Sequence, residues 1–513
     1  MEAGKRHAAR FVRCPERRFA VPFPFGLWPV TERILYMKQN RLLLRLRKGE
    51  PLTGGEQLLL IIQLSIPAIL AQITEVVMEY IDSSMVGSLG ASASASIGLV
   101  ASSTWLFGGL LRACCTGFTV QAAQYIGAGQ EEKARSIRHQ GFVVCLCFSL
   151  LVAAIGAALS SPLPKLLGGG ADITADAAWY FRIFALSAPV IEMVAFGAGM
   201  LQCSGNMVLP SALEILMCAL DVLFNAFWIF PAGHLFAGSP GMGLGVPGAA
   251  LGTVCAEIVT GAILLAVLLL RSPILRIRKG EDRGLHAQDL KNAARIAVPV
   301  GIEQAIQSGA QIVSTTIVAP LGTVSIAANS LAVTAEALCY MPGYGIQTAA
   351  STMIGQSIGA GRMDLVRRLS SLTTFFGMAI QTLSGVVLYL EAPLMMASLS
   401  VDPAVQQLGT EVLRIEAFAE PWFAASIVAG GCFRGAGDTL VPSIMGLVSM
   451  WAVRLPLAAL LTPSMGLHGV WLAMCIELHF RGILFLIRLA GRRWTRKGVI
   501  QGTGTGNAKE EGT

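Results

Sequence analysis

The chain has 513 residues, of which 54% are hydrophobic and only 13% are charged. Soluble domains carry roughly 25% charged residues, so this composition excludes an ordinary soluble protein and indicates a polytopic membrane protein. A transmembrane β-barrel is excluded as well, because the apolar segments run for about 20 to 30 residues, whereas barrel strands alternate over about 10. The 56 glycines and 23 prolines fit membrane helices that pack closely and bend.

The formal net charge of +7 comes from the amino-terminal end of the chain. Residues 1–50 contain twelve Lys and Arg against four Asp and Glu, so they carry +8 and the remainder sums to −1. This stretch lacks the ordered basic, apolar and cleavage regions of a signal peptide. We therefore expect a basic, disordered cytoplasmic extension over 1–55, in which Met37 is a plausible alternative start.

Twelve hydrophobic segments follow from Leu58 onward, each long enough to cross a bilayer as a helix. The segment at 92–126 and its counterpart at 324–357 are too long for a straight span, so we expect tilt or an extension beyond the membrane. The predicted segments are 58–86, 92–126, 131–159, 173–203, 207–231, 246–271, 289–319, 324–357, 363–391, 404–433, 439–461 and 467–490.

Basic residues occur in every second loop, which predicts the side that faces the cytoplasm. They precede the first segment, follow the last, and recur at 133–138, 271–283 and 362–368, while the opposite loops hold almost none besides Lys165. Both termini are therefore predicted to be cytoplasmic. The expected domains are an amino-terminal lobe at 56–271, an inter-lobe loop at 272–288, a carboxy-terminal lobe at 289–491 and a tail at 492–513.

The two halves of the chain repeat each other. Ile126-Gly-Ala-Gly129 recurs 232 residues later as Ile358-Gly-Ala-Gly361, and Arg135 and Pro210 recur at the same offset as Arg367 and Pro442. A duplicated unit of six helices gives parallel copies related by an axis along the membrane normal. The predicted fold is all-α, with twelve transmembrane helices in two pseudo-symmetric six-helix lobes.

Three carboxylates interrupt the first segment, at Glu75, Glu79 and Asp82. Their spacing of i, i+4 and i+7 puts them on one face of an α-helix. A charged group at bilayer depth costs at least ~2.5–3.5 kcal/mol on insertion scales, so such groups mark ion or substrate pathways. We predict a site that handles protons or cations. The alternative is that a shallow helix end leaves Asp82 solvated among the lipid headgroups.

The motifs resemble those of the multidrug and toxic compound extrusion (MATE) transporters over about 55–490. The resemblance implies secondary active efflux by a V-shaped pair of lobes, which exchange cationic or amphiphilic organic compounds for sodium ions or protons. It also implies a monomer in the bacterial inner membrane, no nucleic-acid partner, and no cofactor besides the coupling ion. The matching residues are Asp82-Ser-Ser-Met-Val-Gly87, the paired Ile-Gly-Ala-Gly elements, Arg434-Gly-Ala-Gly-Asp438-Thr-x-x-Pro442 and Arg454-Leu-Pro456.

The amino-terminal lobe resembles the DinF branch of the family more than the NorM branch. Asp82 matches the first-helix aspartate of that branch, and the Asn/Asp pair one turn apart is present in reversed order as Asp221 and Asn225. Thr253 is the matching hydroxyl, and no metal other than sodium is expected at the site. The predicted cation-binding residues are Asp82, Asp221, Asn225, Thr253, Glu79 and Glu75.

The carboxy-terminal lobe matches the NorM pattern poorly, because the family's acidic positions are Gln307 and Phe423 here. Glu303 and Glu420 lie close by in the sequence and remain an alternative second ion site. We expect substrate to meet acids and aromatic rings in a cavity between the lobes. The predicted substrate-binding residues are Glu192, Glu336, Glu303, Gln307, Tyr344 and Trp105.

Two other functions are alternatives to the transport of drugs. A flippase of lipid-linked oligosaccharide, with related architecture, would need deep basic residues, for which the candidates are Arg112, Arg182, Arg414 and Arg454. An enzyme is disfavoured, since the chain has no Gly-x-Ser-x-Gly, Walker or histidine-rich motif. Cysteine pairs such as Cys114-Cys115 have no histidine or carboxylate beside them at zinc spacing, so we interpret the eleven cysteines as reduced, packed thiols.

Overall fold

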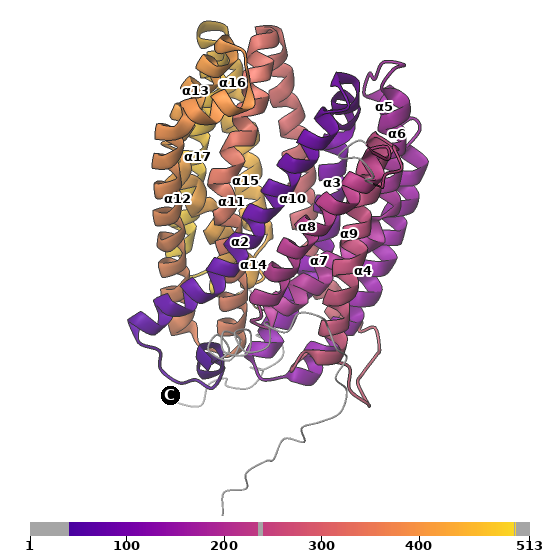
Figure 1. Ribbon diagram of the computed structural model, residues 1–513. Coiled ribbons are helices and arrows are strands. Elements are labelled where there is room, and N and C mark those ends of the chain that lie inside the picture. Colours follow the sequence, from indigo (N-terminus) through magenta and orange to yellow (C-terminus); the bar gives the residue numbers. More distant parts are fainter. Residues whose placement is uncertain (1–40, 234–239, 497, 499–513) are drawn as a thin grey trace, which may run out of the picture.

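The computed structural model describes residues 41–233, 240–496 and 498. In these ranges the regular structure is helical, and the long helices stand side by side in two bundles (Figure 1). The first bundle contains α2 (Gly54–Gly87), α3 (Ala91–Gly127), α4 (Glu131–Leu159), α5 (Leu163–Leu166), α6 (Thr174–Leu186), α7 (Ala188–Cys203), α8 (Val208–Ile229) and α9 (Val246–Ala266). The second contains α10 (Ala287–Val318), α11 (Thr323–Gly359), α12 (Met363–Leu399), α13 (Pro403–Glu416), α14 (Glu420–Gly435), α15 (Leu440–Val448), α16 (Leu455–Met465) and α17 (Leu467–Ala490).

Each of the twelve expected segments coincides with one helix or one broken helix, which confirms the predicted all-α fold class. In the described ranges, nine helices are long and apolar enough to cross a membrane, or ten if the bent pair α6 and α7 is one span. Helix α10 falls outside that set although it is 32 residues long. Its central part carries Gln304, Gln307 and Gln311, which make it more polar than the other long helices.

Two spans are broken at equivalent places of the repeat. Helices α6 and α7 meet at Ser187 with a bend of 47°. In the second half α13 ends at Glu416 and α14 begins at Glu420. Pro189 and Pro421 lie in the first turn after each break, where a proline fits because its missing N–H would have no helical partner. The repeated proline therefore explains why both spans restart there.

The described part of the basic extension is ordered, which differs from the expected disorder. Residues 41–47 are helical, and Leu42, Leu43 and Leu46 are buried in an apolar cluster with Phe433 of the second bundle. The high charge of this stretch concealed an amphipathic helix, because its arginines alternate with leucines that share one face. The rest of the extension, 1–40, and the end of the predicted tail lie outside the described residues.

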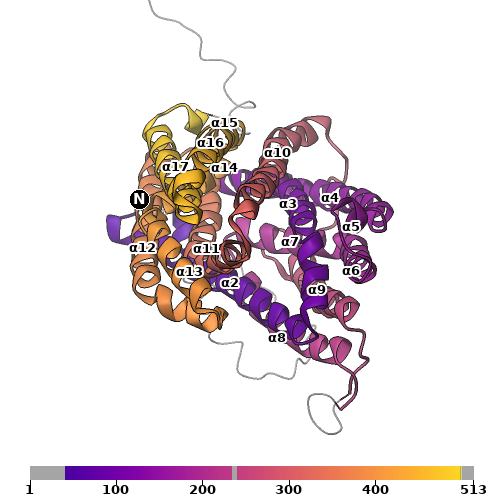
Figure 2. The ribbon, with the colours of Figure 1, turned by 90° about the horizontal axis from the view of Figure 1, so that it is seen from above.

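Helix α2 bridges the two bundles. Seen from above, it lies between α8 of the first bundle and α11 of the second, and it packs against both (Figure 2). The contact with α11 is close enough to need a glycine. A Cβ atom on Gly345 would lie 2.6 Å from the backbone nitrogen of Ile69. Any movement of α2 therefore acts on both lobes.

The paired Ile-Gly-Ala-Gly elements lie where the bundles meet, at the end that carries the basic loops. A Cβ on Gly127 would clash with the backbone of Gln356, and a Cβ on Gly359 would clash with the backbone of Gln124. These two glycines allow α3 and α11 to approach in direct backbone contact. This close approach explains why the motif occurs once in each half.

Two glutamines hold the same contact in place. Nε2 of Gln124 donates to the carbonyl oxygen of Gly435 at 3.0 Å, and Nε2 of Gln356 donates to the carbonyl oxygen of Cys203 at 2.7 Å. Both glutamines are fully buried. Arg47, from the helix at 41–47, adds a third bond by donating from Nε to Oε1 of Gln356 at 3.1 Å. We call Gln124, Gln356, Gly435 and Cys203 the glutamine lock.

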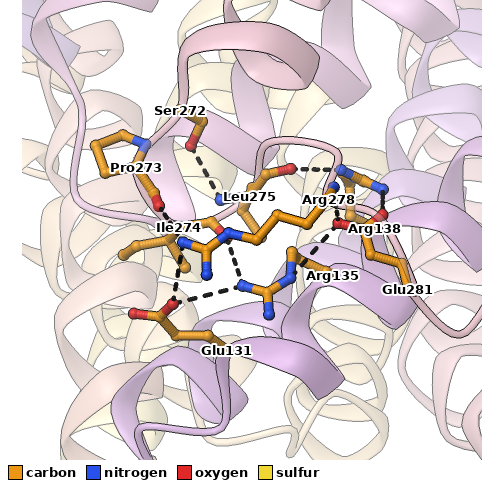
Figure 3. A network of polar contacts seen from close by, with 9 residues as sticks. All are labelled: Glu131, Arg135, Arg138, Ser272, Pro273, Ile274, Leu275, Arg278 and Glu281. Atoms are coloured by element: carbon orange, nitrogen blue, oxygen red, sulfur yellow. Dashed lines mark hydrogen bonds and ion pairs between the residues drawn. The ribbon is translucent and has the colours of Figure 1, made fainter. Parts of the chain in front are cut away.

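The inter-lobe loop is anchored on α4 by a buried ion-pair network (Figure 3). Arg138 contacts Oε2 of Glu281 at 2.8 Å and donates to the carbonyl oxygen of Leu275 at 2.5 Å. Arg135 contacts Glu281 at 3.5 Å and Glu131 at 3.4 Å. The side chains of Arg138 and Glu281 are only 3% and 6% exposed, so the pair is shielded from salt. The loop between the lobes is thus fixed to the first bundle.

Candidate functional site

The packing of α8 against α9 creates the floor of the candidate cation site. Gly248 and Gly252 stand four residues apart on α9, a spacing of small residues that lets membrane helices approach closely. A Cβ on Gly248 would lie 2.5 Å from the carbonyl oxygen of Trp228. One on Gly252 would clash with Oδ1 of Asn225. The glycines therefore allow α9 to lie directly against the polar face of α8.

Three of the predicted residues converge here from α2 and α8. Nδ2 of Asn225 donates to Oδ1 of Asp82 at 2.8 Å and to Oδ2 of Asp221 at 2.9 Å. Asp221 and Asn225 are fully buried, and Asp82 is partly exposed. The amide of Asn225 therefore bridges two carboxylates that lie 139 positions apart in the sequence, at 82 and 221. We call Asp82, Asp221 and Asn225 the acid–amide cluster.

The acid–amide cluster offers oxygen atoms that the described residues leave without hydrogen-bond donors. Oδ1 of Asp221 and Oδ1 of Asn225 are buried and lack a partner within the described ranges. The Thr253 hydroxyl donates to the carbonyl oxygen of Ala249 at 3.3 Å and lies beside the Asp221 carboxylate. Hard cations take carboxylate, amide and hydroxyl oxygens as ligands. The residues present therefore fit a small cation, and the carboxylates fit a proton equally well.

Glu75 and Glu79 are placed differently from these residues. Oε1 of Glu75 forms an ion pair with Arg112 of α3 at 3.1 Å, and its Oε2 accepts from Gln72 at 2.9 Å. Glu79 is exposed. Although all three acids of α2 share a face, Asp82 is the one that accepts a hydrogen bond from α8 among the described residues. The structure thus brings together Asp82, Asp221, Asn225 and Thr253, with Glu75 satisfied elsewhere.

Glu303 and Glu420, the alternative second ion site in the other lobe, do not meet in a cluster of this kind. Oε2 of Glu303 accepts from the Ser443 hydroxyl at 2.7 Å, and its Oε1 accepts from Nε2 of Gln307 at 3.4 Å. Glu420 is fully buried and accepts from Gln381 at 3.2 Å. Glu303 and Glu420 therefore have separate partners, on different helices.

A group of buried glutamates lies deeper in the second lobe, where sequence reasoning considered each residue singly. Glu336, Glu416, Glu420 and Glu477 come from four different helices and are at most 5% exposed. Glu477 pairs with Arg481 through two contacts of 2.8 Å. Both carboxylate oxygens of Glu416 lack a hydrogen-bond partner among the described residues. The cluster could not be predicted from the sequence, because the acids come together only when α11, α13, α14 and α17 pack against one another.

The predicted substrate residues do not form one group. Glu192 is fully buried inside the first lobe, which differs from the expectation that it faces a cavity between the lobes. Glu192 lies on the side of α7 that packs against α3, where it contacts Cys115 in the interior of the lobe. Glu336 is also buried, whereas Trp105 is 48% exposed. Tyr344 packs near Tyr340, with ring centroids 6.0 Å apart.

Twelve helical segments in two equivalent halves, with buried acids on the helices, are the organisation of a duplicated membrane transporter. Comparison with known families agrees. The MatE family model matches the chain twice, at 67–227 and 299–460, together more than half of its length. The two matches begin 232 residues apart, as the repeat predicts. The chain therefore belongs to the MatE family of multidrug efflux transporters, which confirms the resemblance seen in its motifs.

Relatives with this organisation occur in several bacteria. The probable multidrug resistance protein NorM of Thermotoga maritima is 25% identical over 445 residues, covering 86% of this chain and 94% of that protein. The multidrug resistance protein MdtK of Yersinia pestis is 24% identical, covering 85% of this chain and 95% of that protein.

Solved structures show the same fold. The Vibrio cholerae MATE transporter VcmN has a TM-score of 0.78 at 21% identity, over 88% of this chain and 97% of that one. A Pyrococcus furiosus transporter of the MOP superfamily has a TM-score of 0.79 at 19% identity, over 87% of this chain and 99% of that one.

Proposed function

We propose that this protein exports cationic or amphiphilic organic compounds by antiport with sodium ions or protons, as a monomer in the bacterial inner membrane with both termini in the cytoplasm. The names of the NorM and MdtK relatives support multidrug efflux. The observation that carries the proposal is the acid–amide cluster, in which buried oxygens of Asp221 and Asn225 have no hydrogen-bond donor among the described residues.

The position of Asp82 supports a role in coupling. It lies on α2, the helix that packs against both α8 and α11. The carboxylates of Asp82 and Asp221 lie on either side of the Asn225 amide. When no cation or proton is bound and both are ionised, these two carboxylates repel each other. A bound cation or proton removes that repulsion and lowers the cost of enclosing the cluster among apolar helices. Ion binding can therefore favour one position of α2 over another.

Alternating access requires such a difference. A ligand shifts an equilibrium between two states only by its difference in affinity for them. The amide of Asn225 contributes to this difference in affinity, because the two hydrogen bonds of Asn225 join α2 to α8 only while Asp82 stays near Asp221. Uptake of the ion from outside and its release inside would then return the protein for a new cycle of export. Sodium and protons both satisfy this requirement.

The amino-terminal site resembles the DinF-like arrangement, and the oxygen set of Asp82, Asp221, Asn225 and Thr253 supports it. Glu416 supports a second candidate location for coupling, in the other lobe. Its carboxylate is fully buried near the charges of Glu336 and Arg454, and neither oxygen has a hydrogen-bond partner in the part of the chain that the structure describes. Burial of an unpaired carboxylate is costly, so Glu416 is expected to bind a proton.

The four arginines that a flippase would need lie on different helical segments, and each has a partner. Nη2 of Arg454 contacts Sδ of Met474 at 2.6 Å. Arg112 pairs with Glu75 at 3.1 Å. The guanidinium of Arg182 lies over the Trp179 ring at 5.4 Å, and that of Arg414 lies over the Tyr389 ring at 5.3 Å. A pyrophosphate group needs several convergent cations. This arrangement favours export of cations over flipping of lipid-linked oligosaccharide.

Transport by the purified full-length protein in vesicles tests the proposal. Ethidium efflux should follow an imposed sodium or proton gradient, and the active gradient identifies the coupling ion. Anionic dyes should be exported much less, because the acids attract cations. Equal transport of both dye classes would contradict cation selectivity. Absence of any gradient-driven flux by a well-folded preparation would contradict antiport itself.

A further inference from the structure

The interior of the first lobe contains a compact group of sulfur and oxygen atoms that the proposed export does not use. Cys114 and Cys115 come from α3, Cys145 from the middle of α4, and Glu192 from α7. Sγ of Cys145 lies 3.7 Å from Sγ of Cys114 and 3.9 Å from Sγ of Cys115. Sγ of Cys115 lies 3.1 Å from Oε1 of Glu192. We call these four residues the thiol–carboxylate cluster.

The cluster corrects the sequence interpretation of these cysteines as thiols without a carboxylate neighbour. Glu192 is distant in sequence, and only the packing of α7 against α3 and α4 brings it to the sulfurs. Glu192 is fully buried, and its Oε2 has no hydrogen-bond partner among the described residues. A carboxylate left in this state within an apolar core is costly. A ligand that it can bind would relieve that cost.

The geometry fits a metal ion that prefers sulfur. Tetrahedral zinc has Zn–S bonds of about 2.3 Å, which places neighbouring sulfurs about 3.8 Å apart. The distance of 3.7 Å between Sγ of Cys114 and Sγ of Cys145 matches that edge. One ligand atom each from Cys114, Cys145 and Glu192 lies within 4.8 Å of the others. The Cys115 thiol lies beside Cys145 and Glu192 but outside this set of three.

We propose that Cys114, Cys145 and Glu192 bind one thiophilic divalent ion of the Zn²⁺ or Cd²⁺ class, with the neutral Cys115 thiol next to the site. Thiolate ligands select such ions over Mg²⁺ and Ca²⁺, and the carboxylate makes a divalent ion a better match than Cu⁺. The thiols of Cys114 and Cys145 lose their protons when the ion binds, so two protons are released and the site keeps only the single negative charge that Glu192 already carried. Cys114 is partly exposed and gives the ion a point of entry.

Titration of Cd²⁺ into the purified full-length protein tests this site. The protein is kept in detergent, reduced with a phosphine and freed of metal, and it carries Cys147→Ser to remove an exposed thiol two residues from Cys145 on the same helix. The ultraviolet charge-transfer band of a cadmium thiolate should rise to saturation at one ion per chain, with two protons released. The band should be the same in the protein that retains Cys147.

Substitution of the ligands then separates this site from other thiols. Cys145→Ser should abolish the band, Cys114→Ser should reduce it, and Glu192→Gln should keep the band while weakening the affinity at least about tenfold. Cys218→Ser, on α8, is the matched control and should change nothing. A band that persists in Cys145→Ser, or a stoichiometry well below one ion in reduced protein, would overturn the proposal. Size-exclusion profiles and gradient-driven ethidium transport check that each variant is folded.

Discussion

Gln124 and Gln356 make the same hydrogen bond in opposite directions across the contact between the lobes. Each donates from Nε2 to a backbone carbonyl at the end of the fourth helical span of the other half, Gly435 for Gln124 and Cys203 for Gln356. The two glutamines are 232 positions apart, as are the two acceptors. The glutamine lock is thus a symmetric closure of the end that carries the basic loops.

Replacing both glutamines by alanine should weaken that closure. A hydrogen bond contributes about 1 kcal/mol to stability, so each substitution should shift the equilibrium towards opening of this end by about fivefold. The measurement is the distance between spin labels at the exposed positions 133, near the start of α4, and 367, near the start of α12, whose distribution should gain a longer component. Gln288→Ala, at an exposed position near the start of α10, is the control. An unchanged distribution would show that backbone packing alone closes this end.

Asp82→Asn should abolish gradient-driven export while leaving the protein folded and in the membrane. The substitution keeps the size of the side chain and removes the charge that a cation or proton neutralises. Transport into vesicles measures the loss, and the exposed Glu391→Gln is a matched control that should export normally. Gln307→Ala should have a much smaller effect than Asp82→Asn. Normal export by Asp82→Asn, with loss in Glu303→Gln or Glu420→Gln, would move the coupling site to the second lobe.

Gly252→Ala should disrupt the acid–amide cluster through packing. Its Cβ would clash with Oδ1 of Asn225, and overpacking of this kind costs about 1–3 kcal/mol. We expect a lower thermal midpoint and reduced ion-coupled transport. Gly98→Ala is the matched control, because the space around that glycine is open and alanine favours the helix. Equal behaviour of the two variants would mean that α8 and α9 separate without loss of function.

The predicted orientation is tested with a reporter that is active only in the cytoplasm. It should work when fused after Thr513 or inserted within the loop at 272–285, because the flanking basic residues keep these regions inside. It should fail within the loop at 231–246, which lacks basic residues. The opposite pattern of signals would reverse the topology.

The sequence predicted the helices well because hydrophobic length and the repeat determine them directly. Gly127 and Gly359, for example, belong to a motif that recurs at a fixed offset, and both occupy the lobe contact. The acid–amide cluster was predicted only through the family resemblance, because Asp82 and Asp221 lie on helices whose neighbours cannot be deduced from spacing. Helical spacing alone was a poorer guide to the members of the cation site. Glu75, on the same face as Asp82, pairs with Arg112 instead.

Contacts between side chains of different helices were the hardest to predict. Helical periodicity identifies which residues share one helix face, but it does not show which faces of different helices meet. The contact between Cys115 and Glu192, 77 residues apart, is of this kind. The leucines at 42, 43 and 46 are a second case, because their burial depends on the surface that the second lobe offers to an amphipathic helix.

The glutamine lock also bears on the ancestry of the chain. Two identical subunits around a twofold axis make every contact twice, because each residue of one copy that touches the other copy has an equivalent that makes the reverse contact. The breaks that precede Pro189 and Pro421 recur at the same offset. Both features therefore belonged to a six-helix ancestor that paired with itself. Fusion of two such genes then freed each half to diverge, and the equivalent positions 82 and 314 are now an aspartate and a serine.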